Sequence, residues 1–382
     1  MGALQILGFV GPSVNWWALL PQIILLGAAL AILLASALAP QRTTTAFATV
    51  TTLCSAVTSS IIAIGLWNDV RTDGPSSSIA SAFGIDGFSI FFTLLILIGL
   101  AATALLSHDY LDREGIDPPE FHALLLCSAA GAIVMASAND LIVMFLGLEA
   151  LSIGIYVMIA MHHRRSEARE SAIKYFVLGA FSSAFLLYGI ALTYGATGST
   201  NLVHVRNYLD VVVFRDQHLL MAAMALLLVG LSFKVAAAPF HFWAPDVYQG
   251  APSPVTGWMA SIAKAAGFAA LLRIFFAAFA SHNDDWAPIV GVLALITLVI
   301  GAVMAILQTD VKRMLAFSSV SHAGYVLVAV HAASAEGTSA ALFYLFTYTI
   351  MVLGTFAVVG AIGTDDEHPL SRYAGLGRST PV

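Results

Sequence analysis

The chain has 382 residues, of which 59% are hydrophobic and 10% are charged, and its formal net charge at pH 7 is −6. Soluble domains carry about 25% charged residues, so this chain has too few polar side chains to cover a water-facing surface. The composition therefore predicts an all-α polytopic membrane protein, and the acidic balance argues against a nucleic-acid partner. Cys54 and Cys127 lie far apart in apolar runs, a spacing that indicates neither a disulfide framework nor a metal site.

Apolar runs of about 20 residues, long enough to cross a bilayer, are the main feature of the chain. We expect about 11 transmembrane helices, at 15–39, 45–67, 85–106, 120–138, 140–161, 171–195, 217–238, 254–280, 287–307, 313–333 and 338–363. The first run is too long for the core of a signal peptide, and no basic residue precedes it, so we expect a membrane span there and not a removable leader.

Lysine and arginine are distributed unevenly among the loops. Loops after odd-numbered spans hold most of them, including Arg113 and Arg165, whereas loops after even-numbered spans hold only Arg71, Arg206 and Arg215. Because cytoplasmic loops are enriched in basic residues, this distribution predicts an amino terminus outside the cytoplasm.

The sequence contains an internal repeat at an offset of 169 residues. At this offset Tyr156 aligns with Tyr325 and Ser152 with Ser321, without a gap. The two copies start in spans that cross the membrane in opposite directions, which predicts inverted five-helix repeats. We expect N-terminal helices 1–3 in residues 1–119, a first repeat in 120–280 and an incomplete second repeat in 281–382. The counterpart of Lys234 would fall beyond residue 382, so the second repeat is expected to be truncated.

Two residues of opposite charge lie within predicted spans, where an ionised group at a helix centre costs about 2.5–3.5 kcal/mol. They are Glu149 in the fifth span and Lys234 in the seventh. A carboxylate and an ammonium on neighbouring helices offset each other's desolvation, and separating them would favour release of a proton from the lysine. The alternative is a static ion pair that fixes helix packing.

A second set of ionisable residues follows in the sequence. Lys264 lies at the centre of the eighth span with no acid in that span, an arrangement that suits proton relay better than snorkelling to an interface. Pro239 predicts a broken helix after Lys234. His241, within the break, is expected to pass a proton between the two lysines or to water, and His322 in the tenth span to continue the relay.

Two other basic residues admit simpler roles. Arg273 is expected to snorkel to an interface or to pair with a lipid phosphate. Lys174, at the start of the sixth span, is either an interfacial anchor or a proton-entry group. No Gly-rich phosphate loop, haem ligand pair or iron–sulfur cysteine set occurs in the sequence, so we expect no cofactor and no redox chemistry in this chain.

Three segments together resemble the antiporter-like membrane subunits of respiratory complex I. They are 239–252 (PFHFWAPDVYQGAP), 174–180 (KYFVLGA) and 310–322 (DVKRMLAFSSVSH). The ending DVYQGAP is most similar to subunit N, also called NADH dehydrogenase subunit 2, and the resemblance covers essentially the whole chain. It implies two inverted five-helix repeats after three further helices, and a proton channel that uses Glu149, Lys234 and Lys264. It also implies about fourteen helices and a further lysine in the twelfth, which this sequence does not reach.

The resemblance implies a proton-translocating subunit of NADH:quinone oxidoreductase in the inner membrane of a bacterium. NADH, FMN, iron–sulfur clusters and quinone would be used by other subunits, and the partners would be other membrane-arm subunits and the lipid bilayer. The alternatives are a subunit of a multi-subunit cation/proton antiporter, a subunit of a membrane-bound hydrogenase, or a scaffold whose buried charges only lock the helices together.

Overall fold

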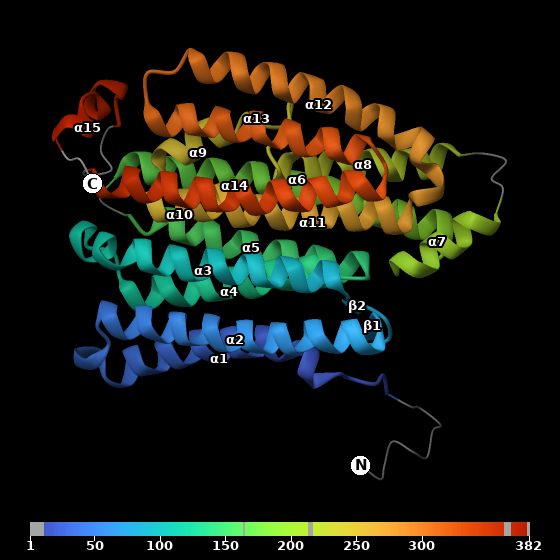
Figure 1. Cartoon of the computed structure of the whole chain (residues 1–382), viewed down its shortest axis with the longest axis horizontal. Helices are drawn as coiled ribbons and strands as arrows, with labels where there is room; N and C mark the ends of the chain where they lie inside the picture. Colours follow the sequence, from blue (N-terminus) through green and yellow to red (C-terminus); the bar gives the residue numbers. More distant parts are fainter. Residues whose placement is uncertain (1–10, 163–164, 213–216, 363–367, 380–382) are drawn as a thin grey trace, which may run out of the picture.

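The computed structural model describes residues 11–162, 165–212, 217–362 and 368–379. Within them the fold is a bundle of long, roughly parallel or antiparallel helices (Figure 1). The helices of the first half are α1 (Trp16–Leu38), α2 (Thr45–Asp73), α3 (Gly87–Glu114), α4 (Pro118–Ser137), α5 (Leu141–Ala160), α6 (Ser166–Thr197) and α7 (Leu202–Val211). Those of the second half are α8 (His218–Lys234), α9 (Ala244–Gly250), α10 (Ser253–Trp258), α11 (Lys264–Arg273), α12 (Asn283–Ile306), α13 (Val311–His331), α14 (Ala335–Ala361) and α15 (Leu376–Ser379).

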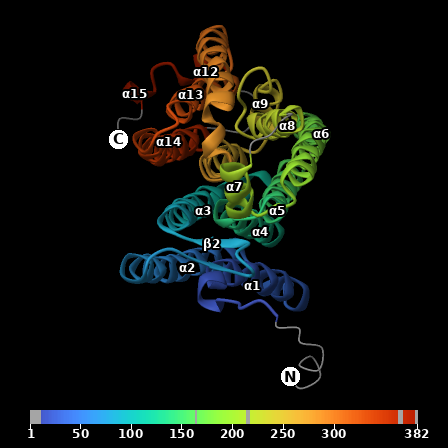
Figure 2. The ribbon, with the colours of Figure 1, turned by 90° about the vertical axis from the view of Figure 1, so that its right-hand side faces the viewer.

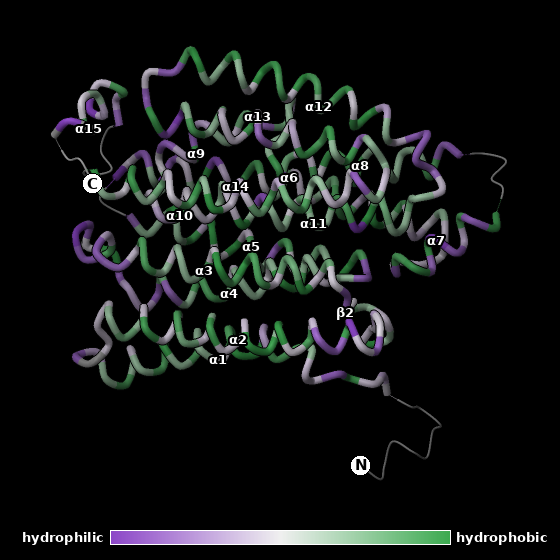
Figure 3. The backbone as a smooth tube through the Cα atoms, viewed as in Figure 1, coloured by the Kyte–Doolittle hydropathy of each residue, from purple (hydrophilic) through white to green (hydrophobic). Residues whose placement is uncertain are grey.

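The predicted membrane spans correspond to helices. Ten of the described helical segments are long and apolar enough to cross a bilayer, counting α10 and α11 with their π-helical turns as one. The remaining predicted span, the seventh at 217–238, is α8, which has 17 residues because the helix ends at Lys234. Hydrophobic residues follow the helices along most of their length, and hydrophilic residues gather at the two ends of the bundle (Figure 3). The all-α polytopic class is therefore confirmed.

The helices lie in successive layers, seen nearly end-on in Figure 2. The pair α1 and α2 packs on α3 and α4, and α4 packs on α5. Beyond them come α6 with α8 and the segment 253–278, and the pair α12 and α13 lies at the far side. The segment 253–278 is central, since 94% of its most apolar stretch is buried within the protein.

The two ends of the bundle differ. One, the hairpin end, carries strands β1 (Ser76–Ser78) and β2 (Phe83–Ile85), which pair in antiparallel register. The other, which we call the basic end, carries the loops after α3, α5 and α12. The sequence did not predict the hairpin or α7, and Arg215, which entered the orientation argument, lies outside the described residues. Which end faces the cytoplasm remains a prediction from the loop charges.

Matching backbone contacts support the predicted repeat. The α5 helix starts after Asp140, whose side chain caps it, and Asp140 forms an antiparallel bridge with Asn201. The α13 helix starts after Asp310, which caps it in the same way and bridges Pro369. These bridges lie at opposite ends of the bundle, so α5 and α13 run in opposite directions (Figure 1). The division of the chain at residues 119 and 280 stays a prediction.

Candidate functional site: two buried lysines and the helix break between them

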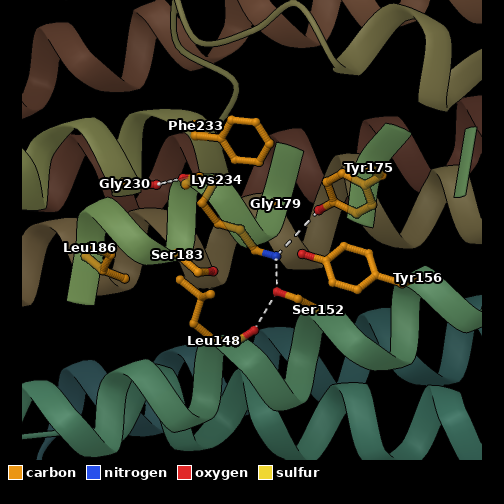
Figure 4. A pocket seen from close by; sticks show the side chains of 11 residues that line it. Leu148, Ser152, Tyr156, Tyr175, Gly179, Ser183, Leu186, Gly230, Phe233 and Lys234 are labelled. Carbon is orange, nitrogen blue, oxygen red and sulfur yellow. Dashed lines mark hydrogen bonds between the residues drawn. The ribbon is translucent and has the colours of Figure 1, made fainter. Parts of the chain in front are cut away.

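Lys234 is the last residue of α8 and points into the space between α5 and α6 (Figure 4). Its side chain is buried, and its Nζ donates a hydrogen bond of 2.8 Å to the Ser152 hydroxyl and one of 3.5 Å to the Tyr175 hydroxyl. The Tyr175 ring stacks on Trp243 at 4.5 Å, so the helix break that carries Trp243 fixes the phenol. The ammonium is therefore held by neutral hydroxyl groups.

Glu149 lies near Lys234 but is bonded elsewhere. Its Oε1 accepts a hydrogen bond of 2.5 Å from the Ser183 hydroxyl on α6. Among the described residues there is no ion pair within 4 Å between Glu149 and Lys234, although Ser183 and Lys234 line the same cavity of about 10 Å³. The direct ion pair, one of the two arrangements expected from the sequence, is therefore not the one the structure shows.

The α6 helix lies close to Lys234 because Gly179 has no side chain. A Cβ atom at this position would overlap the Tyr156 hydroxyl, which lies between α5 and α6. Tyr156 in turn packs edge-on against Tyr175, with ring centroids 4.9 Å apart. The glycine thus allows two phenols to surround the ammonium on the same side of the cavity.

The helix break follows Lys234 at once, five residues earlier than Pro239 alone predicts. Backbone groups freed by a break inside a membrane need partners within the protein. The Phe233 carbonyl accepts a hydrogen bond of 3.0 Å from Trp243 Nε1, and the Ala238 amide donates one of 2.9 Å to Thr297 Oγ1. Two side chains therefore stabilise the break: Trp243, which lies within it, and Thr297 on α12.

Lys264 lies at the junction of a π-helical turn, Met259–Ala263, with α11. Its side chain is 3% exposed, which is inconsistent with snorkelling to an interface. The ammonium donates hydrogen bonds of 2.6 Å to the Ser319 carbonyl and 2.5 Å to the Ser319 hydroxyl, both on α13. π-Helical turns are frequent at functional sites because they redirect side chains. Here the turn precedes a lysine that contacts the predicted second repeat.

The helices that carry the two lysines are in contact. A Cβ atom at Gly267, one turn after Lys264, would lie 3.3 Å from Cγ of Lys234 and 3.0 Å from the Val235 side chain. The aliphatic stem of Lys234 therefore packs on the helix that holds Lys264. The two ammonium groups point away from this contact, one toward α5 and the other toward α13.

His241 and His322 lie in different surroundings. His241 lines an open apolar groove of about 500 Å³ with Asp246, Arg313 and Phe317, and its Nδ1 is buried without a partner of hydrogen-bonding geometry in the described part of the chain. His322 lines a separate cavity and its Nδ1 lies 2.7 Å from the Tyr344 hydroxyl. The structure brings His322, but not His241, close to the residue that binds Lys264.

Residues 138–382 match the family model described as the transmembrane region of NADH:quinone oxidoreductase and Mrp antiporters. The chain belongs to this family. It is 38% identical over 372 residues to NADH-quinone oxidoreductase subunit N of Trichlorobacter lovleyi, covering 97% of this chain and 75% of that protein.

Two solved structures have folds similar to that of this chain. A chain of respiratory complex I from Thermus thermophilus with bound aureothin is 37% identical, with a TM-score of 0.77 over 94% of this chain and 75% of that one. A chain of the membrane-bound sulfane sulfur reductase, an archaeal respiratory membrane complex, is 26% identical, with a TM-score of 0.82 over 95% of this chain and 75% of that one. The similarity extends beyond residues 138–382 to the N-terminal helices.

Asp246 is the centre of a cluster of charged side chains at the basic end, of which the sequence analysis singled out only Lys174. Asp246 accepts hydrogen bonds of 3.0 Å from Lys174 and 2.7 Å from Arg313, and Lys174 also pairs with Glu170 at 2.6 Å. Partial burial acts to raise the pKa of the Asp246 carboxyl, but the two hydrogen bonds outweigh it and the pKa is lowered. Asp246 thus ties α6 to α13 through the short helix α9.

Arg273 corrects an expectation. Its Nη2 binds both carboxylate oxygens of Asp86, at 2.8 and 2.9 Å, and its Nε donates to the Ala136 carbonyl at 2.8 Å. The guanidinium therefore neither snorkels nor pairs with lipid, because a partner 187 positions earlier in the chain lies beside it. The described residues contain no group of three or more His, Cys, Asp or Glu that could hold a metal ion.

Proposed function

We propose that this chain is a proton-translocating membrane-arm subunit of NADH:quinone oxidoreductase. The observation that carries the proposal is the pair of buried lysines, Lys234 and Lys264, on packed helices that flank a helix break. Each ammonium is bonded to hydroxyl or carbonyl oxygens and, among the described residues, to no carboxylate. Buried cations held in this way exchange protons more readily than those locked in ion pairs.

The first step of the pathway involves Glu149 and Lys234. Redox chemistry in other subunits alters the distance between them, and the carboxylate stabilises the ammonium when it is near. With Glu149 bonded to Ser183, the Lys234 ammonium has only the Ser152 and Tyr175 hydroxyls as partners and lacks a bound carboxylate that would stabilise its charge. The proton then moves toward Lys264 and His322.

His241 supplies exchange with water in this proposal. The sequence suggested that His241 passes a proton either between the two lysines or to water. The groove supports exchange with water, because it extends from His241 to Asp246 and Arg313 at the basic end. A neutral imidazole at such a position both accepts and donates protons near physiological pH.

The partners are other antiporter-like membrane-arm subunits and the lipid bilayer. NADH, FMN, iron–sulfur clusters and quinone are assigned to other subunits, in agreement with the lack of cofactor motifs in this sequence. The location is the inner membrane of a bacterium, with the hairpin end and the amino terminus on the outer side. The repeats 120–280 and 281–382 provide the two inverted halves, supported by the matching Asp140 and Asp310 caps.

The test is the substitution Lys234→Ala in the assembled complex, reconstituted into vesicles. We expect most of the coupled proton translocation to be lost while the complex persists, because Lys234 is the only basic residue among the described residues that line the cavity. Arg206→Ala is the matched control, since it removes a positive charge from an exposed ion pair with Asp210. Normal pumping stoichiometry in Lys234→Ala would contradict the proposal.

Two rival functions make different predictions. A subunit of a cation/proton antiporter would show sodium-dependent transport and would purify without flavin and iron–sulfur subunits. A scaffold would respond to Lys234→Ala with less assembled complex but normal pumping per complex. Measuring assembly and pumping on the same preparation separates the scaffold from the translocating subunit.

A further inference from the structure

Two buried phenol hydroxyl groups near Lys264 have no hydrogen bond of normal geometry to any residue that the structure describes. Tyr248 on α9 is fully buried and Tyr348 on α14 is 4% exposed. Both hydroxyls lie near the Ser319 hydroxyl, but neither forms a hydrogen bond of normal geometry within the described residues. Because buried polar groups in folded proteins are nearly always satisfied by protein or by ordered water, these two groups indicate a solvent molecule.

A cavity of suitable size is lined by Tyr348 and by Ser319, the serine that lies near both phenol hydroxyls. Its volume is about 30 Å³, and its polar lining comes from Ser318, Ser319 and His322 on α13 and from Tyr348 and Thr355 on α14. A buried water needs about 10–15 Å³ and two to four polar partners, and this cavity offers both. By contrast, the cavity at Lys234 measures about 10 Å³, which is at the lower limit for one water.

The cavity lies between two groups that carry protons. Ser319 accepts a hydrogen bond from Lys264, and His322 contacts Tyr344 through Nδ1, which leaves Nε2 available. We infer that an ordered water in this cavity links Ser319, and through it Lys264, to His322. Tyr348, which lines the cavity, positions the water, and Tyr248, which lies outside the cavity lining, positions the serine hydroxyl. This inference rests on the proposed function and names the connection between two of its proton carriers.

The transfer balances in protons. Lys264 gives one N–H proton to the Ser319 oxygen, whose own hydroxyl proton passes to the water. The water passes one of its protons to Nε2 of His322, in the tautomer whose Nδ1–H donates to Tyr344. Lys264 ends as a neutral amine and His322 as an imidazolium, while the serine and the water keep their original number of protons.

The test uses Tyr348→Phe in the complete complex, reconstituted into vesicles. This change removes one hydroxyl and keeps the ring, so we expect a fall in protons translocated per NADH oxidised that approaches the fall in Lys264→Ala. Tyr325→Phe is the matched control, because Tyr325 also packs near His322 but is 54% exposed and does not line the cavity. It should pump normally.

A second variant guards against a folding defect. Ala260 lines the cavity and is buried, so Ala260→Val fills the water site while both tyrosine hydroxyls stay in place. We expect it to lower pumping as Tyr348→Phe does. A cryo-EM map of the wild-type complex that resolves buried waters should show a peak in contact with Ser319, Tyr348 and His322, and this peak should be missing in Ala260→Val.

The outcomes separate the two proposals. Normal pumping in Lys264→Ala would overturn the proposed function. Loss of pumping in Lys264→Ala together with normal pumping in both Tyr348→Phe and Ala260→Val would overturn the water link alone. A wild-type map that shows other buried waters but an empty cavity here would do the same.

Discussion

The two lysine sites stabilise a buried ammonium group in different ways. Lys234 lies in a cavity of only about 10 Å³, with Glu149 close by but bonded to Ser183. Lys264 has no acid bonded to it among the described residues and depends on both oxygens of Ser319, next to a cavity that admits water. In the mechanism that we propose, a movable carboxylate controls the first site, whereas hydration connects the second.

The largest effect that would sharpen this comparison is expected from Ser152→Ala. It removes the 2.8 Å hydrogen bond to the Lys234 ammonium, and hydrogen bonds to charged groups are worth about 1.5–3 kcal/mol. We expect proton translocation to fall by about tenfold or more, since 1.4 kcal/mol corresponds to a factor of ten.

Ser152→Thr keeps the hydroxyl and should restore most of the activity of the Ser152→Ala variant. The measurement is initial proton uptake by vesicles at equal amounts of assembled complex. Equal rates in the alanine variant and the wild type would show that the hydroxyl does not control Lys234, and the contrast between the sites would then lose its basis.

A stability effect of intermediate size is expected at Arg273, which lies on the same helix as Lys264. Arg273→Met leaves the partly exposed Asp86 without its partner, a loss of about 1–3 kcal/mol once solvent access to the carboxylate is considered. We expect a lower melting temperature of the complex and normal pumping per assembled complex.

Asp86→Asn with Arg273→Met should recover part of that stability, because the unpaired charge is then gone. A pumping defect in correctly assembled Arg273→Met would show that this charge belongs to the transport path. The static role assigned to it here would then be wrong.

The smallest effect concerns Asp246, which joins the two regions by binding Lys174 on α6 and Arg313 on α13. The pKa of the Asp246 carboxyl is lower in the folded protein than in the unfolded chain, where it is about 3.9. The stabilisation by these contacts is therefore fully present above the unfolded-state pKa. It is lost as the pH falls through the lower folded-state pKa. Thermal stability should therefore not vary with this group between about pH 5 and 8.

Asp246→Asn is the matched variant, because it cannot titrate. It should melt slightly lower than the wild type near neutral pH, and the difference should shrink in acid below about pH 4. A difference that grows as the pH is lowered would contradict the assignment of a lowered pKa.

Much of the fold was predictable because membrane spans are long and apolar. The ten long described spans lie where the apolar runs predicted them, and Asp140 and Asp310 mark the starts of equivalent helices. The helix break was predictable from Pro239, but its start at Lys234 depends on Trp243 and Thr297, which supply hydrogen bonds from elsewhere in the fold.

The site was predictable as a set of residues and not as a set of contacts. Glu149, Lys234 and Lys264 stood out because charge is rare inside an apolar run. Their partners are ordinary serines and tyrosines, which occur throughout membrane helices and carry no distinguishing pattern. The role of His241 stays a prediction, since the structure places it in a groove away from both lysine hydrogen-bond networks.

The sequence by itself determined that the protein lies in a lipid bilayer. It also determined the number and approximate limits of the spans, and which few positions carry charge in the bilayer. Those properties are local, because the cost of a polar group in hydrocarbon acts on each segment separately. The tertiary structure decided that Arg273 meets Asp86 and that Lys264 meets Ser319, pairs separated by 187 and 55 positions. Such contacts arise only when helices from distant parts of the chain pack together.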